Sequence, residues 1–237
     1  MTEETPPVRR SDGSRMRPEG APAVKPRDAA TLFIIRRDGP KPRVLMGKRN
    51  GGHDFMPNLW VFPGGRIDRA DFRAPFATEL KPEVAGKFHA HLPGNRGRAL
   101  ALAAIRETFE EAGLLLAKQA DPRPAAGPWR EFLAQGAMPD LEALSIIYRA
   151  VTPPVLAKRF DTWFLMADAE RLISLERQPD CGELEEIAWF EFEEALELNL
   201  PMVTRSVIKE AEARLEEPDR PIPYMRFRMG PTKPRVL

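Results

Sequence analysis

Three glutamates in the segment AIRETFEEAGLLL (104–116) are the residues whose types and spacing could do chemistry. Glu107, Glu110 and Glu111 are three and four residues apart, so on an α-helix their side chains project from one face. Like charges at this spacing repel each other by roughly 0.2–0.5 kcal/mol per pair on an exposed helix. Either the carboxylates form a solvated helix face, or a divalent cation holds them together.

Neighbouring residues favour the cation. Carboxylate oxygens on a rigid helix are ligands that suit Mg²⁺ or Mn²⁺, ions that proteins commonly share with substrate phosphates. Arg106 precedes Glu110 by four residues and can hold that carboxylate in one rotamer. Upstream, FPGG (62–65) supplies Gly64 and Gly65, whose lack of side chains lets a phosphate chain approach the backbone. These features fit metal-assisted attack of water on a phosphoanhydride.

The composition of the whole chain narrows the class of protein. Its 237 residues can bury one sizeable core, and 36 basic against 35 acidic residues give a net charge of +1. We therefore expect neither nucleic acid nor a membrane as a partner. Cys181 is the only cysteine, so no intrachain disulfide is available and a cytoplasmic location is expected. No apolar run approaches the roughly 18 residues that a membrane helix needs.

The pattern of apolar residues predicts strands and helices that intermix without a regular βαβ rhythm. Residues 1–27 are rich in proline and charge and are expected to be a mobile arm. A domain over 28–237 follows. Its expected strands cover 29–37, 43–49, 59–67, 140–153, 159–168 and 186–192, the first two forming a hairpin. Its expected helices cover 76–91, 98–113, 193–199 and 203–217, Gly113 capping the second, and 218–237 is expected to be extended.

Gly65 together with RETFEEAGL (106–114) resembles the Nudix box, Gly-x5-Glu-x7-Arg-Glu-U-x-Glu-Glu-x-Gly-U, where U is a bulky aliphatic residue. Two positions depart from the pattern, because Thr108 stands at the first U and Asp71 stands where the family has glutamate. The spacing departs as well. The arginine expected eight residues after Asp71 stands at Arg106, which implies an insertion of about 27 residues, placed at about 72–98.

The insertion leaves the role of Asp71 open. Three other acidic residues near or within the insertion could replace it in the site: Asp68, Glu79 and Glu83. His89 and His91 also lie within the insertion, and we interpret them as surface residues rather than as a metal pair.

An interrupted box of this kind is similar to the branch of the Nudix family that includes coenzyme A diphosphatases. TPPVLAKRFDTWFLMA (152–167) and LPMVTRSV (200–207) look like downstream segments of that branch, so the resemblance covers about 28–237. It implies an α+β fold, an α/β/α sandwich with a mixed sheet flanked by helices. It also implies Mg²⁺ or Mn²⁺ as cofactor and a nucleotide-type small molecule as substrate. Dimers are frequent in the family, so a homodimer is one expected assembly.

The resemblance assigns roles to particular residues. Glu110 and Glu111 are the favoured metal ligands, and Glu107 either binds metal or orients the water, beside Arg106. A loop glutamate can act as base in this family, which points to Glu183 and Glu186, although an ordinary acidic loop is an equal interpretation. The expected substrate-binding residues are Arg49, Lys48, Gly64 and Gly65.

Three functions remain open at this point. The leading hypothesis is hydrolysis of coenzyme A or an acyl-coenzyme A to 3′,5′-ADP and a phosphopantetheine. The second keeps the chemistry and changes the substrate to ADP-ribose or a nucleotide sugar. The third is a Nudix-fold binding module without turnover, which the complete set of Arg106 and the three glutamates disfavours.

Overall fold

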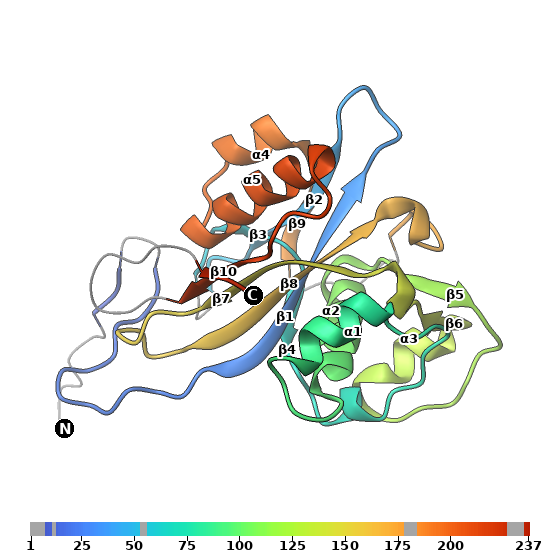
Figure 1. The fold of residues 1–237 in the computed structure, drawn as a ribbon, viewed down its shortest axis with the longest axis horizontal. Helices are drawn as coiled ribbons and strands as arrows, with labels where there is room; N and C mark the ends of the chain where they lie inside the picture. Colours follow the sequence, from blue (N-terminus) through green and yellow to red (C-terminus); the bar gives the residue numbers. More distant parts are fainter. Residues whose placement is uncertain (1–7, 11–12, 53–55, 178–183, 227–234) are drawn as a thin grey trace.

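A mixed β-sheet with helices on both faces forms the centre of the computed structural model, which describes residues 8–10, 13–52, 56–177, 184–226 and 235–237 (Figure 1). Within these residues the sheet has nine strands, in the order β11-β10-β7-β8-β1-β2-β3, with β4 also paired to β1 and β9 to β2. The strands are β1 (Arg27–Arg36), β2 (Arg43–Arg49), β3 (Trp60–Val61), β4 (Gly64–Arg66), β7 (Ser145–Val151), β8 (Phe160–Asp168), β9 (Leu184–Glu191), β10 (Pro223–Arg226) and β11 (Arg235–Val236). β1 and β8 run parallel, whereas β1 and β2 form the expected antiparallel hairpin.

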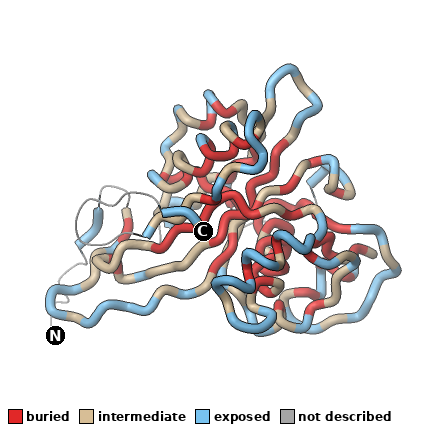
Figure 2. Tube along the Cα trace, viewed as in Figure 1, coloured by how far each residue is buried: buried red, intermediate tan, exposed pale blue. Residues whose placement is uncertain are grey.

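Side chains of the central strands alternate between two apolar cores, as the period of a strand requires. Leu32 and Ile34 of β1 face a core shared with α1 (Pro82–His89), α2 (Arg96–Ala112) and α3 (Arg130–Ala134). Phe33 and Ile35 face a second core shared with α4 (Phe192–Glu197) and α5 (Met202–Glu216). Buried segments therefore run through the sheet and along the inner sides of both helical layers (Figure 2). The predicted α+β sandwich is confirmed.

The helix bounds follow local chemistry. α2 covers nearly the whole of the predicted 98–113, and Gly113 ends it at φ 68°, ψ 22°, with its N–H donating to the Phe109 carbonyl over 2.8 Å. The helix predicted over 76–91 is shorter, because α1 begins only at Pro82. Lys81 has an extended ψ of 143°, the conformation that a following proline imposes.

Two further differences concern strands. The strand expected over 59–67 is interrupted after Val61 and resumes at Gly64, as β3 and β4. The strand expected over 140–153 begins only at Ser145, as β7, because Leu141–Ala143 forms a short 3₁₀ helix. The sequence pattern also did not predict the small hairpin of β5 (Ala117–Gln119) and β6 (Ala137–Pro139), nor α3 between these strands. These elements are short and carry little periodicity.

The described part of the N-terminal segment, which the sequence predicts to be a mobile arm, contacts the loop at 152–159. The N–H of Arg17 donates to the Val155 carbonyl over 2.8 Å, and the N–H of Ala157 donates to the Arg15 carbonyl over 3.0 Å. Ser14 is fully buried. Backbone pairing of this kind needs no apolar side chains, so the composition of the segment could not reveal it.

Candidate functional site

The three glutamates lie on the C-terminal half of α2, where the helix packs against β4. They do not form a solvated face. The side chains of Glu107 and Glu110 are 19% and 37% exposed, and Glu111 is buried. Carboxylates drawn this far out of water need specific partners. The arrangement therefore favours a built site over the solvated alternative.

The buried carboxylate of Asp71 supports the site by binding Arg106. This carboxylate is fully buried and accepts two hydrogen bonds from the Arg106 guanidinium, at 3.0 Å from Nε and 3.1 Å from Nη2. The indole N–H of Trp129 donates to the same carboxylate over 3.0 Å, and the backbone N–H of Asp68 donates over 2.7 Å. Asp71 therefore binds the arginine of the motif.

Arg106 connects Asp71 to two of the glutamates. Its Nη1 donates to Glu107 over 2.9 Å and to Glu110 over 2.8 Å, so both carboxylates lie around one nitrogen atom. Burial lowers the pKa of Arg106, but the adjacent carboxylates of Asp71, Glu107 and Glu110 outweigh it and raise that pKa. Burial raises the pKa of Glu110, a shift that Arg106 reduces and Glu107 reinforces. The group is therefore a fixed cation surrounded by crowded carboxylates.

Two glycines of β4, Gly64 and Gly65, make room for these carboxylates where the strand pairs with β1. Gly64 donates its N–H to Glu111 over 2.8 Å. A Cβ placed on Gly65 would lie 2.4 Å from the carboxyl carbon of Glu107, far closer than any real contact. The Glu107 carboxylate therefore occupies the space that a side chain at position 65 would need. The glycines let the helix present its carboxylates at the edge of β4.

The carboxylates line a cavity of about 830 Å³. This volume lies within the range of small-molecule sites. The cavity is also bounded by β1, β8, the loop 152–159 and the first residues of α5. Its charged lining outside α2 is cationic: Arg10, Arg27, Arg49, Arg66, Lys158 and Arg159. An acidic edge facing several cations suits an anionic ligand that binds together with a metal ion.

The structure brings some of the predicted residues to the cavity and leaves others away from it. Arg49, Gly64 and Gly65 line it together with the three glutamates. Lys48 and Glu186 do not line it and face each other across β2 and β9, with 3.9 Å between Nζ and the carboxylate. Glu183 lies outside the described residues.

The structure also places the acidic residues that could replace Asp71 in the site. Asp68 supports Asp71 through its backbone, while its side chain accepts from the N–H of Ala70 over 2.7 Å. Glu79 forms an ion pair with Arg98, and Glu83 is exposed in the first turn of α1. None of these three carboxylates bonds to Arg106, whereas Asp71 accepts two hydrogen bonds from it.

Trp129 and Arg66 are site residues that the sequence reasoning missed. Trp129 lies 58 residues from Asp71 in the chain, and no motif joins the two. Arg66 directly follows the two glycines, and its place next to FPGG was the one signal that could have singled it out.

The site contains residues able to hold a metal ion, although their side chains do not converge on one position. Within the described residues, no three carboxylate, histidine or cysteine side chains converge as a preformed metal site. Glu107 and Glu110 nevertheless meet at a single nitrogen, and half-buried carboxylates are the donors that a hard divalent cation prefers. The donor set fits Mg²⁺ or Mn²⁺.

Comparison with known proteins places the chain. The NUDIX domain model matches residues 25–211. Acyl-coenzyme A diphosphatase NUDT19 of Gallus gallus is 33% identical over 155 residues, 49% of this chain and 39% of that protein. Its Xenopus laevis counterpart is 28% identical over 210 residues, 65% and 54% of the two chains. The chain thus spans about half the length, or less, of these curated relatives.

A solved structure agrees with this placement. The NUDIX hydrolase from Alicyclobacillus acidocaldarius is 28% identical, with a TM-score of 0.59 over 81% of this chain and 96% of that chain. Nudix hydrolases generally need divalent metal ions. In the part of the chain that the structure describes, no helix combines the length and apolar character needed to cross a membrane.

Proposed function

The chain belongs to the NUDIX family, and on that premise we propose that it is a metal-dependent diphosphatase acting on coenzyme A or an acyl-coenzyme A. The products are 3′,5′-ADP and the corresponding phosphopantetheine. One observation carries the reaction type: the α2 carboxylates, packed against Gly64 and Gly65, line a cavity whose other charged lining residues are cationic. The names of the curated relatives support the substrate.

Each residue of the site has a proposed role. Glu110 and Glu111 would hold Mg²⁺ or Mn²⁺, which would supply neutralisation of phosphate charge and activation of a water molecule for attack. Arg106 fixes the rotamers of Glu107 and Glu110 through its two hydrogen bonds. The cavity-lining Arg49 and Arg66 pair with phosphate oxygens.

The proton of the attacking water also needs an acceptor. We assign this role to Glu107 rather than a place among the metal ligands, because its carboxylate packs against Gly65 and lines the cavity. Glu183 stays an alternative because it lies outside the described residues. The position of Glu186 opposite Lys48, away from the cavity lining, gives that residue no support as the base.

Product analysis tests the proposal. The purified chain is offered coenzyme A, acetyl-coenzyme A, ADP-ribose and a UDP-sugar in parallel, with Mg²⁺, Mn²⁺ or no metal. The Glu110→Gln and Glu111→Gln variants are compared with Glu79→Gln, which removes a carboxylate paired to Arg98 outside the cavity. Metal-dependent release of 3′,5′-ADP, lost in the first two variants and kept in the third, is expected.

Other outcomes would redirect the proposal. Turnover of ADP-ribose alone would keep the mechanism and move the substrate. No metal-dependent turnover of any compound would favour a binding module. Light scattering on the same preparation tests the predicted homodimer.

A further inference from the structure

A row of residues on β1 forms part of the cavity wall. Thr31, Ala29 and Arg27 alternate along the strand, so they share one face, and all three line the cavity. Thr31 lies opposite Gly64 in β4, and Ala29 lies opposite Arg66. Arg27 comes one step further along this face, beyond the last pair with β4.

The position of Arg27 separates it from the metal-binding edge. Thr31 is four residue steps along the strand from Arg27, which corresponds to about 13 Å of backbone. Arg27 instead lies beside the loop that supplies Lys158 and Arg159 to the cavity, and its N–H donates to the Arg159 carbonyl over 2.9 Å. The acidic residues of the cavity lining are the three glutamates of α2. Positive charge therefore collects at the far end without an acidic lining residue beside it.

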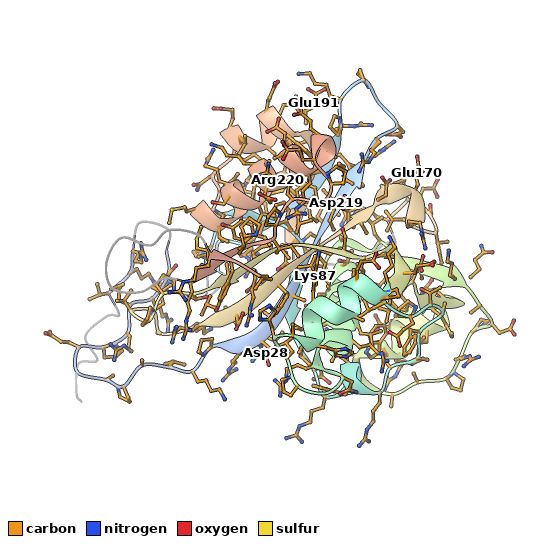
Figure 3. The ribbon with its side chains drawn as sticks, viewed as in Figure 1. Asp28, Lys87, Glu170, Glu191, Asp219 and Arg220 are labelled. Carbon is orange, nitrogen blue, oxygen red and sulfur yellow. The ribbon has the colours of Figure 1, made fainter. Side chains whose placement is uncertain are left out.

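The chain offers the Arg27 guanidinium no partner among the described residues. Asp28 is next in sequence but lies on the opposite face of β1, where it pairs with Arg96 of α2; Figure 3 marks Asp28 at the start of the strand. The nearby Arg159 is held differently, because its guanidinium donates to the Val24 and Thr152 carbonyls at 2.7 and 3.0 Å. Burial and the charge of Arg226 lower the pKa of Arg159, which agrees with an excess of positive charge here.

We infer that Arg27 is the centre of a second anion subsite, which binds a phosphate of the substrate that is not part of the hydrolysed diphosphate. A cavity-lining guanidinium without a protein partner suits bidentate pairing with phosphate. The inference rests on the proposed function for its reaction and deepens it by naming the substrate class: a nucleoside diphosphate that carries a third, separate phosphate. Coenzyme A carries one on its ribose, and ADP-ribose and UDP-sugars do not.

Calorimetric binding of two nucleotides to the full chain tests the subsite without turnover. Adenosine 3′,5′-bisphosphate and 5′-AMP differ by one phosphate, and neither contains the diphosphate bond. The unmodified chain, with Mg²⁺ present, should bind the bisphosphate at least about 10-fold more tightly. Arg27→Gln should reduce that ratio to about 2-fold or less and leave 5′-AMP binding unchanged, and Arg27→Lys should restore part of it.

Lys25→Gln is the matched control. It removes the same charge two residues away, from an exposed side chain that does not line the cavity, and should keep the ratio. The subsite is overturned if the unmodified chain shows no preference, if Arg27→Gln keeps the ratio, or if Lys25→Gln lowers it equally. A thermal melt of each variant shows that it is folded.

Turnover separates this inference from the proposed function. Coenzyme A and dephospho-coenzyme A share the diphosphate and differ in the third phosphate. Hydrolysis of both, with a KM advantage for coenzyme A that Arg27→Gln removes, is expected. If neither is hydrolysed, the proposed function fails while the binding ratio still decides the subsite.

Discussion

Two arginine environments on either side of the glutamates differ in how completely the chain satisfies them. Every nitrogen of the buried Arg106 guanidinium donates to a carboxylate or a carbonyl, and its partner Asp71 also receives Trp129. Arg27 and Arg66, on the cavity face, have no side-chain partner among the described residues. The first environment is complete without a ligand, whereas the second leaves its charges for one. On the proposed function, this difference separates the residues that build the site from those that bind substrate.

The largest expected effect on stability comes from removing a partner of Arg106. Asp71→Ala leaves the Arg106 guanidinium buried without its bidentate partner and should lower the free energy of unfolding by about 3 kcal/mol. Urea unfolding measures the loss. Glu79→Ala, which breaks an ion pair whose side chains are 38% and 48% exposed, should cost at most about 1 kcal/mol. Equal losses would mean that the Asp71 pair is no more than a surface contact.

A milder change tests whether the hydrogen bonds around Asp71 and Arg106 position the carboxylates for metal binding. Trp129→Phe removes the N–H that Asp71 accepts but keeps an aromatic ring, and Mn²⁺ affinity should fall about 10-fold as Arg106 loses its fixed position. Electron paramagnetic resonance of free Mn²⁺ measures this affinity without turnover.

Phe132→Leu is the control for this change. Phe132 packs on Trp129 with ring centroids 5.2 Å apart but is not among the donors to Asp71, so the variant should lose stability and keep the Mn²⁺ affinity. A parallel loss of affinity in both variants would show that only packing matters.

The smallest effect concerns Asp140, a buried carboxylate whose partners reach solvent. Burial raises the pKa of Asp140, but the Thr78 hydroxyl and the Arg171 guanidinium outweigh it and hold that pKa below 3.8. The unfolded chain therefore binds this proton first as the pH falls. The stability from Asp140 is complete above about pH 4 and is lost as the pH drops below it.

Unfolding of the native chain and of Asp140→Asn at about pH 6 and at about pH 3 measures this dependence. The stability difference between the two proteins should shrink at the lower pH. A difference that stays constant would separate Asp140 from the acid response.

Local features of this fold could be predicted from the sequence, and so could the helix at its site. The spacing of Glu107, Glu110 and Glu111 and the position of Gly113 are properties of one helix, and the structure contains that helix with that cap. The alternation in β1 and β8 is local in the same sense. The Arg106–Glu110 ion pair also follows from an i,i+4 spacing.

Contacts between distant segments could not be predicted. Asp71 and Arg106 are 35 residues apart, and the insertion between them hides their relation. Trp129 reaches Asp71 only because α3 and its neighbouring turn pack against α2. The separation of Lys48 from the cavity likewise depends on the pairing of β2 with β9, which no short motif encodes.

The close approach of Glu107 to Gly65 also determines which inherited changes the protein can tolerate. A single methyl group there would lie 2.4 Å from the Glu107 carboxyl carbon, so even alanine would displace that carboxylate. At Gly86 in α1, by contrast, an added Cβ would meet nothing within 4 Å. Natural variation should therefore be free at Gly86 and purged at Gly65, where selection keeps a side chain out of the space that the Glu107 carboxylate fills.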